Sequence, residues 1–226
     1  MKFYDYHVHP EIDLENMLSM AEKLGWSGVC LACRSFREIE EARNNLRKTG
    51  LEVAFGYKIE ARKPAEIAKT AKKIRKRVEL ILVHGGDPEI NRKACETPEV
   101  DVLAHPELGR NDPGLDHVMV KLAKENGVSI EFNFRNLLLS YKKSRSDIFS
   151  NMTENAKLVR KFRAPFVITS GALEPYDLRP PSELISFANL LGLNTKETKN
   201  RLSGKILEEN RKRLDSKWVM PGVELE

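Results

Sequence analysis

The chain has 226 residues, of which 41% are hydrophobic and 31% are charged, and its formal net charge is +5. This composition excludes a disordered chain and is typical of a globular protein with a core, which we expect to form one domain over residues 1–226. No apolar run approaches the roughly 20 residues of a membrane span and no signal peptide precedes the first predicted strand, so we expect a cytoplasmic protein without a membrane partner.

Residues 2–10 predict a first β-strand, because aromatic and β-branched residues lead to a proline at which strand pairing must stop. Side chains of a strand alternate between its two faces. We therefore expect Asp5, His7 and His9 on one face, with the residues between them on the other. Three groups that can handle a metal or a phosphate on one face are more than core packing alone would select.

Strand and helix patterns alternate along the following residues. Further strands are predicted at residues 28–33, 51–59, 79–84, 100–105, 128–134 and 165–169. Helices are predicted at residues 12–24 and 38–48, from Pro64, from a cap at Asp87–Pro88, from a second cap at Asp112–Pro113 to Gly127, and at residues 153–162 after a polar segment at 140–150.

The pattern changes after Gly171. Residues 172–181 read as a proline-bearing loop, and Ser182 is predicted to cap a helix that ends near Gly192. Two shorter helices follow at about residues 195–202 and 205–214. We expect the helices within about 182–215 to pack on the preceding part as a C-terminal extension, and the tail at 216–226 to be frayed.

Seven strands that alternate with helices through short linkers predict a parallel α/β sheet. Histidine or acidic residues close several of these strands, which favours a barrel, since only a barrel brings all carboxyl ends around one mouth. We predict a distorted (β/α), TIM-like barrel of about seven parallel strands with a helical C-terminal extension.

Four of the five histidines lie at or just before a predicted strand end, and two glutamates occupy comparable places on the third and sixth strands. In a barrel these side chains would converge at the mouth, where imidazoles and carboxylates can hold divalent metals. They can equally form hydrogen bonds with one another and with a few water molecules at a solvent-filled barrel end. The spacing leaves both interpretations open. The residues are His7, His9, His84, His105, Glu60 and Glu131.

Several of these segments resemble the metal motifs of the PHP (polymerase and histidinol phosphatase) superfamily, a seven-stranded βα barrel. They are Tyr6-His7-Val8-His9, Lys58-Ile59-Glu60, Val83-His84-Gly85 and Ala104-His105-Pro106. The resemblance implies His7, His9, Glu60, His84 and His105 as metal ligands. The superfamily's final motif, Asp-x-His, should fall at residues 169–172, where the chain has Thr-Ser-Gly-Ala. A phosphoesterase needs its metals to make hydroxide, so we expect an incomplete site with weak residual binding of a divalent metal.

A second family, which also lacks the final Asp-x-His motif, resembles the chain over about residues 1–214. The opening Phe3-Tyr4-Asp5-Tyr6-His7-Val8, the predicted strand from Ile130 to Leu138, Val167-Ile168-Thr169-Ser170-Gly171-Ala172, and Leu190-Leu191-Gly192-Leu193 before a helix pair are similar to the archaeal ribonuclease P protein component 3 family. This implies a non-catalytic subunit of a ribonucleoprotein that removes 5′ leaders from precursor tRNA. It further implies that the RNA subunit does the chemistry with Mg²⁺, that the chain itself needs no cofactor, and that it pairs with protein component 2.

Basic side chains supply candidates for RNA contact. Lys72, Lys73 and Lys76 belong to the strongest cluster, although a lysine-rich helix face is usually only solvated. Single arginines in the loops at strand ends are sharper candidates, because a guanidinium suits phosphate and these loops open on one face of a barrel. These arginines are Arg34, Arg62, Arg110, Arg135 and Arg179.

From these observations we predict a protein subunit of ribonuclease P that binds RNA phosphates and another protein subunit. Two alternatives stay open. One is a metal-dependent PHP-type phosphoesterase that uses the histidines and Glu60. The other is a barrel that binds an anionic small molecule without RNA, through the amides of Gly85–Gly86 and Gly171.

Overall fold

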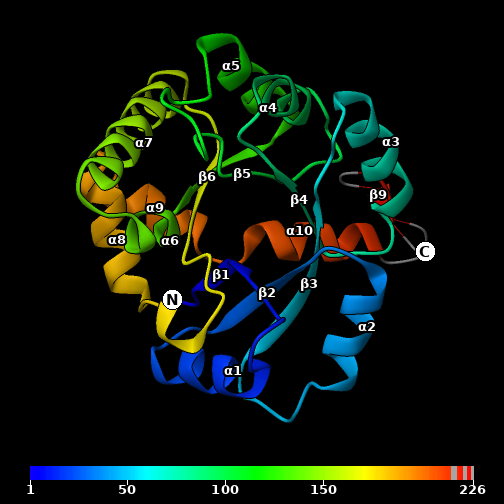
Figure 1. Cartoon of the computed structure of the whole chain (residues 1–226). Coiled ribbons are helices and arrows are strands. Elements are labelled where there is room, and N and C mark those ends of the chain that lie inside the picture. The colour runs from blue at the N-terminus through cyan, green and yellow to red at the C-terminus, as the bar shows by residue number, and fades with distance from the viewer. Residues whose placement is uncertain (215–217, 221–222, 225–226) are drawn as a thin grey trace.

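The computed structural model describes residues 1–214, 218–220 and 223–224. Seven parallel strands pair in sequence order and curl into a nearly closed barrel with helices around it (Figure 1), which confirms the predicted TIM-like fold. The strands are β1 (Tyr4–Val8), β2 (Gly28–Cys33), β3 (Glu52–Ile59), β4 (Leu80–His84), β5 (Val102–Ala104), β6 (Ser129–Asn133) and β7 (Phe166–Thr169).

The helices between the strands pack one apolar stripe against the outside of the barrel. In α3, for example, Ile67, Ala71 and Ile74 are buried at helical spacing. The helices are α1 (Leu14–Lys23), α2 (Phe36–Asn44), α3 (Pro64–Ile74), α4 (Pro88–Cys95), α5 (His117–Asn126), α6 (Phe134–Leu139) and α7 (Lys142–Phe162). The chain continues through a 3-10 turn (Pro175–Asp177) into α8 (Pro181–Leu190), α9 (Thr195–Arg201) and α10 (Lys205–Leu214). Across the described residues we find no helix that is both long and apolar enough to cross a membrane.

Three predicted boundaries are wrong. The side chain of Asp112 accepts from Gly114 N in a local turn, and α5 begins only at His117, with Asp116 as its N-cap. The strand predicted at residues 128–134 ends at Asn133, whose side chain accepts from Arg135 N and caps the short helix α6, so the segment up to Leu138 is helical rather than extended. The polar segment at 140–150 is helical and forms the first part of α7.

Two predictions in the C-terminal part also need correction. Ser182 does not cap α8, because the helix begins one residue earlier, at Pro181, with Pro180 at the N-cap position. The tail predicted to be frayed contains β8 (Trp218–Met220) and β9 (Val223–Glu224), which pair antiparallel. The rest of that tail, at 216–217, 221–222 and 225–226, lies outside the described residues.

Alternation along the strands separates the apolar side chains into two clusters. The larger, outer cluster lies between the strands and the helices. The smaller, inner cluster fills the barrel and includes Leu207, which α10 inserts from the amino-terminal end of the strands. Cys30 belongs to the inner cluster and Cys33 to the outer one.

A bulge in β1 changes which side chains face the interior. The register of β1 on β2 shifts between Asp5 and Val8. Tyr6 belongs to the inner cluster and Val8 to the outer one, yet His7 between them also turns inward, where its ring meets Glu131. The strict alternation predicted for this strand is therefore wrong, because a bulge places one extra residue in the strand and re-aims the side chain that follows.

The barrel closes between β1 and β7 through a side chain rather than through a strand ladder. The carboxylate of Asp5 accepts from Ser170 N at 3.2 and 3.3 Å, and His9 N donates to Ala172 O at 2.8 Å. Burial raises the pKa of Asp5 to about 6. This seam leaves the upper ends of β1 and β7 in contact at the mouth.

Helix α10 covers the opposite end of the barrel (Figure 1), where polar contacts anchor it. The hydroxyl of Tyr6 accepts from Gly204 N at 3.0 Å. The Asn210 amide donates to Glu79 O and to Asp101 Oδ1, each at 2.9 Å. Asn210 is 2% exposed and Asp101 is 8% exposed, so the hydrogen bond between them lies inside the protein.

We expect Asn210→Ala to lower the free energy of unfolding by about 1–3 kcal/mol, since the substitution removes the donor from the buried Asp101 Oδ1 and one of the donors from the partly buried Glu79 O. Urea unfolding monitored by circular dichroism measures this change. The control is Glu209→Ala, an exposed position on the same helix, which should change stability by no more than about 0.5 kcal/mol. Equal stability of the two variants would contradict the anchoring role of Asn210.

Candidate functional site at the barrel mouth

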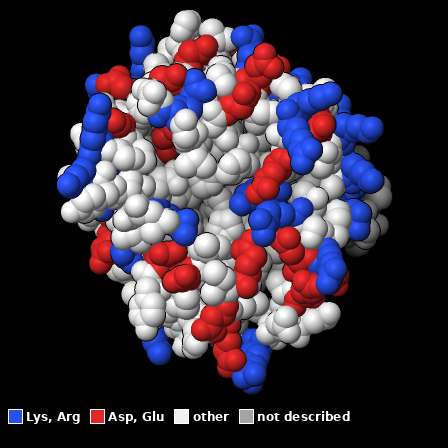
Figure 2. All heavy atoms as spheres, viewed as in Figure 1, with Lys and Arg blue, Asp and Glu red and all other residues white. Residues whose placement is uncertain are grey.

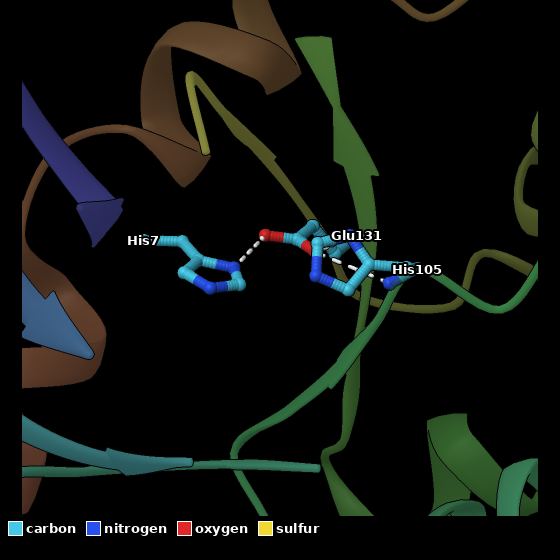
Figure 3. Close-up of side chains that lie close together, drawn as sticks. All are labelled: His7, His105 and Glu131. Atoms are coloured by element: carbon cyan, nitrogen blue, oxygen red, sulfur yellow. Dashed lines mark hydrogen bonds and ion pairs between the residues drawn. The ribbon is translucent and has the colours of Figure 1, made fainter. Parts of the chain in front are cut away.

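The inner positions at the carboxyl ends of the strands bring a group of polar side chains together. His7 comes from β1, His84 from the end of β4, His105 from the residue after β5, and Glu131 from β6. Figure 3 shows the rings of His7 and His105 on either side of the Glu131 carboxylate. The predicted convergence of histidines at one mouth is therefore confirmed.

Glu131 is fully buried and acts as the common acceptor of this group. Its Oε1 lies 2.7 Å from His7 Nδ1 and accepts from Thr169 Oγ1 at 2.7 Å. Its Oε2 accepts from His105 N at 3.1 Å, and the ring nitrogen His105 Nδ1 lies 3.3 Å away. Burial alone would raise the pKa of Glu131, but attraction to His7 and His105 and the bonds from His7 and Thr169 lower it overall.

The remaining histidines extend the cluster through ring contacts. Ring centroids lie 4.9 Å apart for His7 and His9, 5.1 Å for His7 and His105, and 5.3 Å for His84 and His105. Burial lowers the pKa of His9 to about 4 and that of His105 to about 3, and it also lowers the pKa of His84. Burial therefore favours the neutral form of these three rings.

Residues 169–172, where the PHP motif would supply its last ligands, form hydrogen bonds within the barrel instead. Thr169 donates to Glu131, and Ser170 N donates to Asp5. Gly171 has a φ of +64°, and a Cβ there would lie 2.3 Å from the Asn133 amide. Only glycine fits this combination of a left-handed backbone and a close neighbour.

The structure brings together part of the predicted metal-ligand set. His7, His105 and Glu131 offer ligand atoms within 4.8 Å of one another. His9 and His84 lie beside them, but Glu60 is 47% exposed and pairs with Lys58 Nζ at 3.4 Å. Glu60 therefore lies outside the compact group, whose acidic member is Glu131.

These residues do not fit the complete metal cluster that the PHP resemblance implies. Both oxygens of Glu131 already take hydrogen bonds from protein donors. Lys58, whose side chain is 7% exposed, turns into the same mouth and brings a positive charge close to the ring nitrogens. A cation in this place opposes the binding of a divalent metal. The His7, His105 and Glu131 group retains the donor chemistry for one weakly held ion.

Lys58, Asn133 and Glu107 belong to the site and were not among the predicted site residues. The sequence signal for Lys58 and Asn133 is alternation, since Lys58 lies four residues along β3 from inward-facing Ala54 and Asn133 lies two residues along β6 from inward-facing Glu131. Glu107 lies in the loop after β5, where the sequence carries no periodic signal. Its position depends on the tertiary fold.

Two predicted RNA-binding arginines lie at the mouth, which encloses about 440 Å³. Arg34 pairs with Glu11 at 2.9 Å and is 48% exposed. Arg135 pairs with Asp177 at 3.0 Å and is 29% exposed. Figure 2 shows the mouth as a hollow near the middle of this face, with basic and acidic side chains along its rim.

The other predicted basic residues lie outside this cavity. Arg110 pairs with Asp112 through two nitrogens and donates to Gly86 O, and Arg179 donates to the carbonyls of Tyr176 and Leu178. Arg62 is exposed at the start of the loop before α3. Lys72, Lys73 and Lys76 are exposed on and after the last turn of α3. The arginines therefore do not form one continuous cluster.

The carboxyl of Glu107 is buried and incompletely bonded. The Asn136 amide donates to Oε1 at 3.4 Å, and among the described residues Oε2 has no hydrogen-bond donor. Burial raises the pKa of this carboxyl to about 7. The folded state therefore holds this proton over a pH range in which the unfolded chain has released it.

This pKa predicts a specific pH dependence of stability. A raised folded-state pKa contributes stability that is complete below about pH 4.5 and is lost as the pH rises through about 7. Between pH 4.5 and 8 the wild-type chain should lose stability relative to Glu107→Gln by on the order of 3 kcal/mol. Urea unfolding of both chains across this range measures the difference. Glu125→Gln, at an exposed position, should show no such trend, and parallel curves for Glu107→Gln and wild type would contradict the prediction.

Comparison with known proteins adds to this geometry. The family described as RNase P subunit p30 matches residues 2–215. The chain is 34% identical to ribonuclease P protein component 3 of Methanothermobacter thermautotrophicus over 222 residues, covering 93% of this chain and 90% of the relative. It is 35% identical to the component 3 protein of Methanosarcina mazei over 231 residues, covering 99% and 95%.

A solved structure supports the same relationship. A chain in the cryo-EM structure of archaeal ribonuclease P with mature tRNA superposes with a TM-score of 0.84 at 30% identity. The match covers 98% of this chain and 97% of that one. Sequence similarity and fold thus agree over nearly the whole length, and the chain belongs to the RNase P subunit p30 family.

Proposed function

We propose that this chain is a protein subunit of ribonuclease P and supports an RNA catalyst that removes the 5′ leader from precursor tRNA. The observation that carries the proposal is the end-to-end match to a chain in a ribonuclease P structure that also contains mature tRNA. The mouth geometry agrees with a supporting role, because both oxygens of Glu131 accept hydrogen bonds from protein groups, which weakens this carboxylate as a metal ligand.

The phosphoesterase alternative is less well supported. Such an enzyme needs metal ions that activate water and neutralise the phosphate. Here Glu60 points to Lys58, and residues 169–172 form internal hydrogen bonds. The family relationship likewise favours the subunit over a barrel that binds a small anion without RNA.

The subunit acts, in this proposal, by neutralising RNA phosphates. Arg34 and Arg135 stand at the mouth, held in place by Glu11 and Asp177. Within the described residues the ion pair of Arg135 uses Nε, which leaves its terminal amino groups for a bidentate phosphate contact. Such contacts lower the self-repulsion of a folded RNA and so reduce the magnesium that it needs.

We also propose partners, a location and a metal requirement for this subunit. The partners are the ribonuclease P RNA, protein component 2 and, through the complex, precursor tRNA, all in the cytoplasm. Mg²⁺ serves the RNA, and the chain itself requires no cofactor. A divalent ion at His7, His105 and Glu131 would be a residual and weakly bound one.

The isolated chain should not cleave precursor tRNA or a phosphomonoester, because its described residues form no complete metal cluster that could activate water. Purified protein is assayed with magnesium, manganese and zinc against both substrates. Turnover near or above about 1 s⁻¹ that vanished in His7→Ala would contradict the subunit proposal.

Elemental analysis after dialysis against a mild chelator is the companion measurement, and it should find less than one metal ion per chain. Two or three tightly held ions would show an intact cluster.

Arginines at the mouth should contribute more to RNA binding than lysines on the outer helix. Arg34→Ala or Arg135→Ala should weaken association with ribonuclease P RNA by about 1–3 kcal/mol, the scale of a charge-assisted hydrogen bond. Each should also flatten the salt dependence by roughly one phosphate contact. The triple change Lys72→Ala, Lys73→Ala and Lys76→Ala should cost less, because these exposed side chains lose entropy when they are fixed. Filter binding across a salt series, with component 2 present, measures these effects.

A matched control separates the mouth from general positive charge. Arg37→Ala removes an arginine that is 88% exposed on α2 and should leave binding within about twofold of wild type. If the lysine triple abolished binding while both mouth variants bound normally, the RNA would contact the outer face of α3 and the proposed face would be wrong.

A further inference from the structure

An apolar groove lies on the outside of the barrel, beside the mouth, and α6 contributes residues to both. Helix α6, the start of α7 and the end of α8 line it, and it encloses about 530 Å³. Its walls carry Phe134, Leu137, Leu138, Phe149, Phe187 and Leu190. Figure 2 shows mostly uncharged atoms over α6 and the adjoining part of α8, at the left of the view.

This groove coincides with a concentration of exposed apolar side chains. Leu190, in the groove wall, is 73% exposed. Leu139 and Tyr141, which are sequence neighbours of the lining residues Leu138 and Lys142, are 60% and 72% exposed. Single exposed apolar residues are ordinary on a protein surface, but a contiguous group beside an apolar groove marks an interaction site. The groove therefore has the character of a surface that a partner covers.

The start of α7 forms one wall without packing on the core. The buried residues of this helix begin at Asn151, and residues 141–147 are all exposed. The helix has no side-chain N-cap and no acidic residue in its first turn. Lys142, Lys143 and Arg145 lie there instead, at the end where the helix dipole is already positive. This charge distribution opposes the dipole within the chain and suits an acidic group from outside.

Charge and polarity together select the occupant. An apolar floor with a basic rim does not suit an RNA backbone, which is polar throughout. A second copy of this chain, docked symmetrically, would bring two copies of the same basic rim into one interface and supply no acidic partner from the groove itself, because a twofold interface uses the same patch on both chains. A protein helix with an apolar face and carboxylates along its flank matches both features.

We propose that this groove, between α6, α7 and α8, is the docking site for an amphipathic, acid-flanked helix of the partner protein subunit. The inference rests on the proposed function, in which that partner is protein component 2. Leu190 and Phe149 contact the apolar face of the partner helix, and Lys142 pairs with its carboxylates.

Isothermal titration of component 2 into the full chain tests this docking site. Leu190→Glu places a charge on the groove wall and should weaken association at least tenfold, as expected for a buried interface anchor. Lys142→Glu should weaken it severalfold and reduce its dependence on salt. Val118→Glu, on α5, makes the same kind of change at an exposed apolar position outside the groove and should bind as wild type does.

The results that would contradict the docking site differ from those that would contradict the proposed function. Wild-type affinity of Leu190→Glu would overturn the docking site while leaving the subunit role intact. Failure of component 2 to bind the wild-type chain would count against the proposed pairing itself. A wild-type dimer that Leu190→Glu converts to a monomer would assign the groove to a second copy and overturn the inference. Far-ultraviolet circular dichroism of each variant confirms that it is folded.

Discussion

The barrel mouth depends on one buried carboxylate. Glu131 on β6 takes hydrogen bonds from His7 on β1, Thr169 on β7 and the backbone after β5, so it joins strands that lie far apart in the sequence. A buried charge destabilises a fold unless its hydrogen-bonding capacity is used. Here that capacity is used by the strands on both sides of the β1–β7 seam, where Asp5 joins the strands instead of a ladder. The carboxylate therefore stabilises the place at which the barrel would open.

The same hydrogen bonds explain why a mouth that resembles a metal site need not be catalytic. Hydrogen bonds from protein groups take up lone pairs on both oxygens of Glu131, which leaves this carboxylate less able to bind a metal. Lys58 adds a fixed positive charge where a metal would bring its own. The cluster has the residue types of a metal site, but its hydrogen bonds join the strands of the barrel. Residue types read from a motif consequently say less about chemistry than the partners of each atom do.

The sequence predicted most of the fold because strand and helix periods are strong local signals. All seven barrel strands lie where expected, and α10 has the predicted bounds. Local signals failed where contacts with other strands determine the local conformation or the direction of a side chain. The bulge that turns His7 inward lies within an otherwise regular alternation. Asp112–Pro113 has the composition of a helix cap but forms a turn, and Glu60 lies at a strand end yet turns toward Lys58. Such choices depend on neighbours from other strands, which no local pattern contains.

The two outer features of the molecule suit different kinds of partner. The mouth is polar and carries arginines held by carboxylates, whereas the groove beside α6 is apolar and is bordered by basic residues. Most helical stability in proteins comes from packing rather than from propensity, and the start of α7 buries nothing in this chain. An acid-flanked helix in the groove would supply both the missing burial and the missing negative charge. One partner would then complete the helix and leave the arginines of the mouth free for RNA.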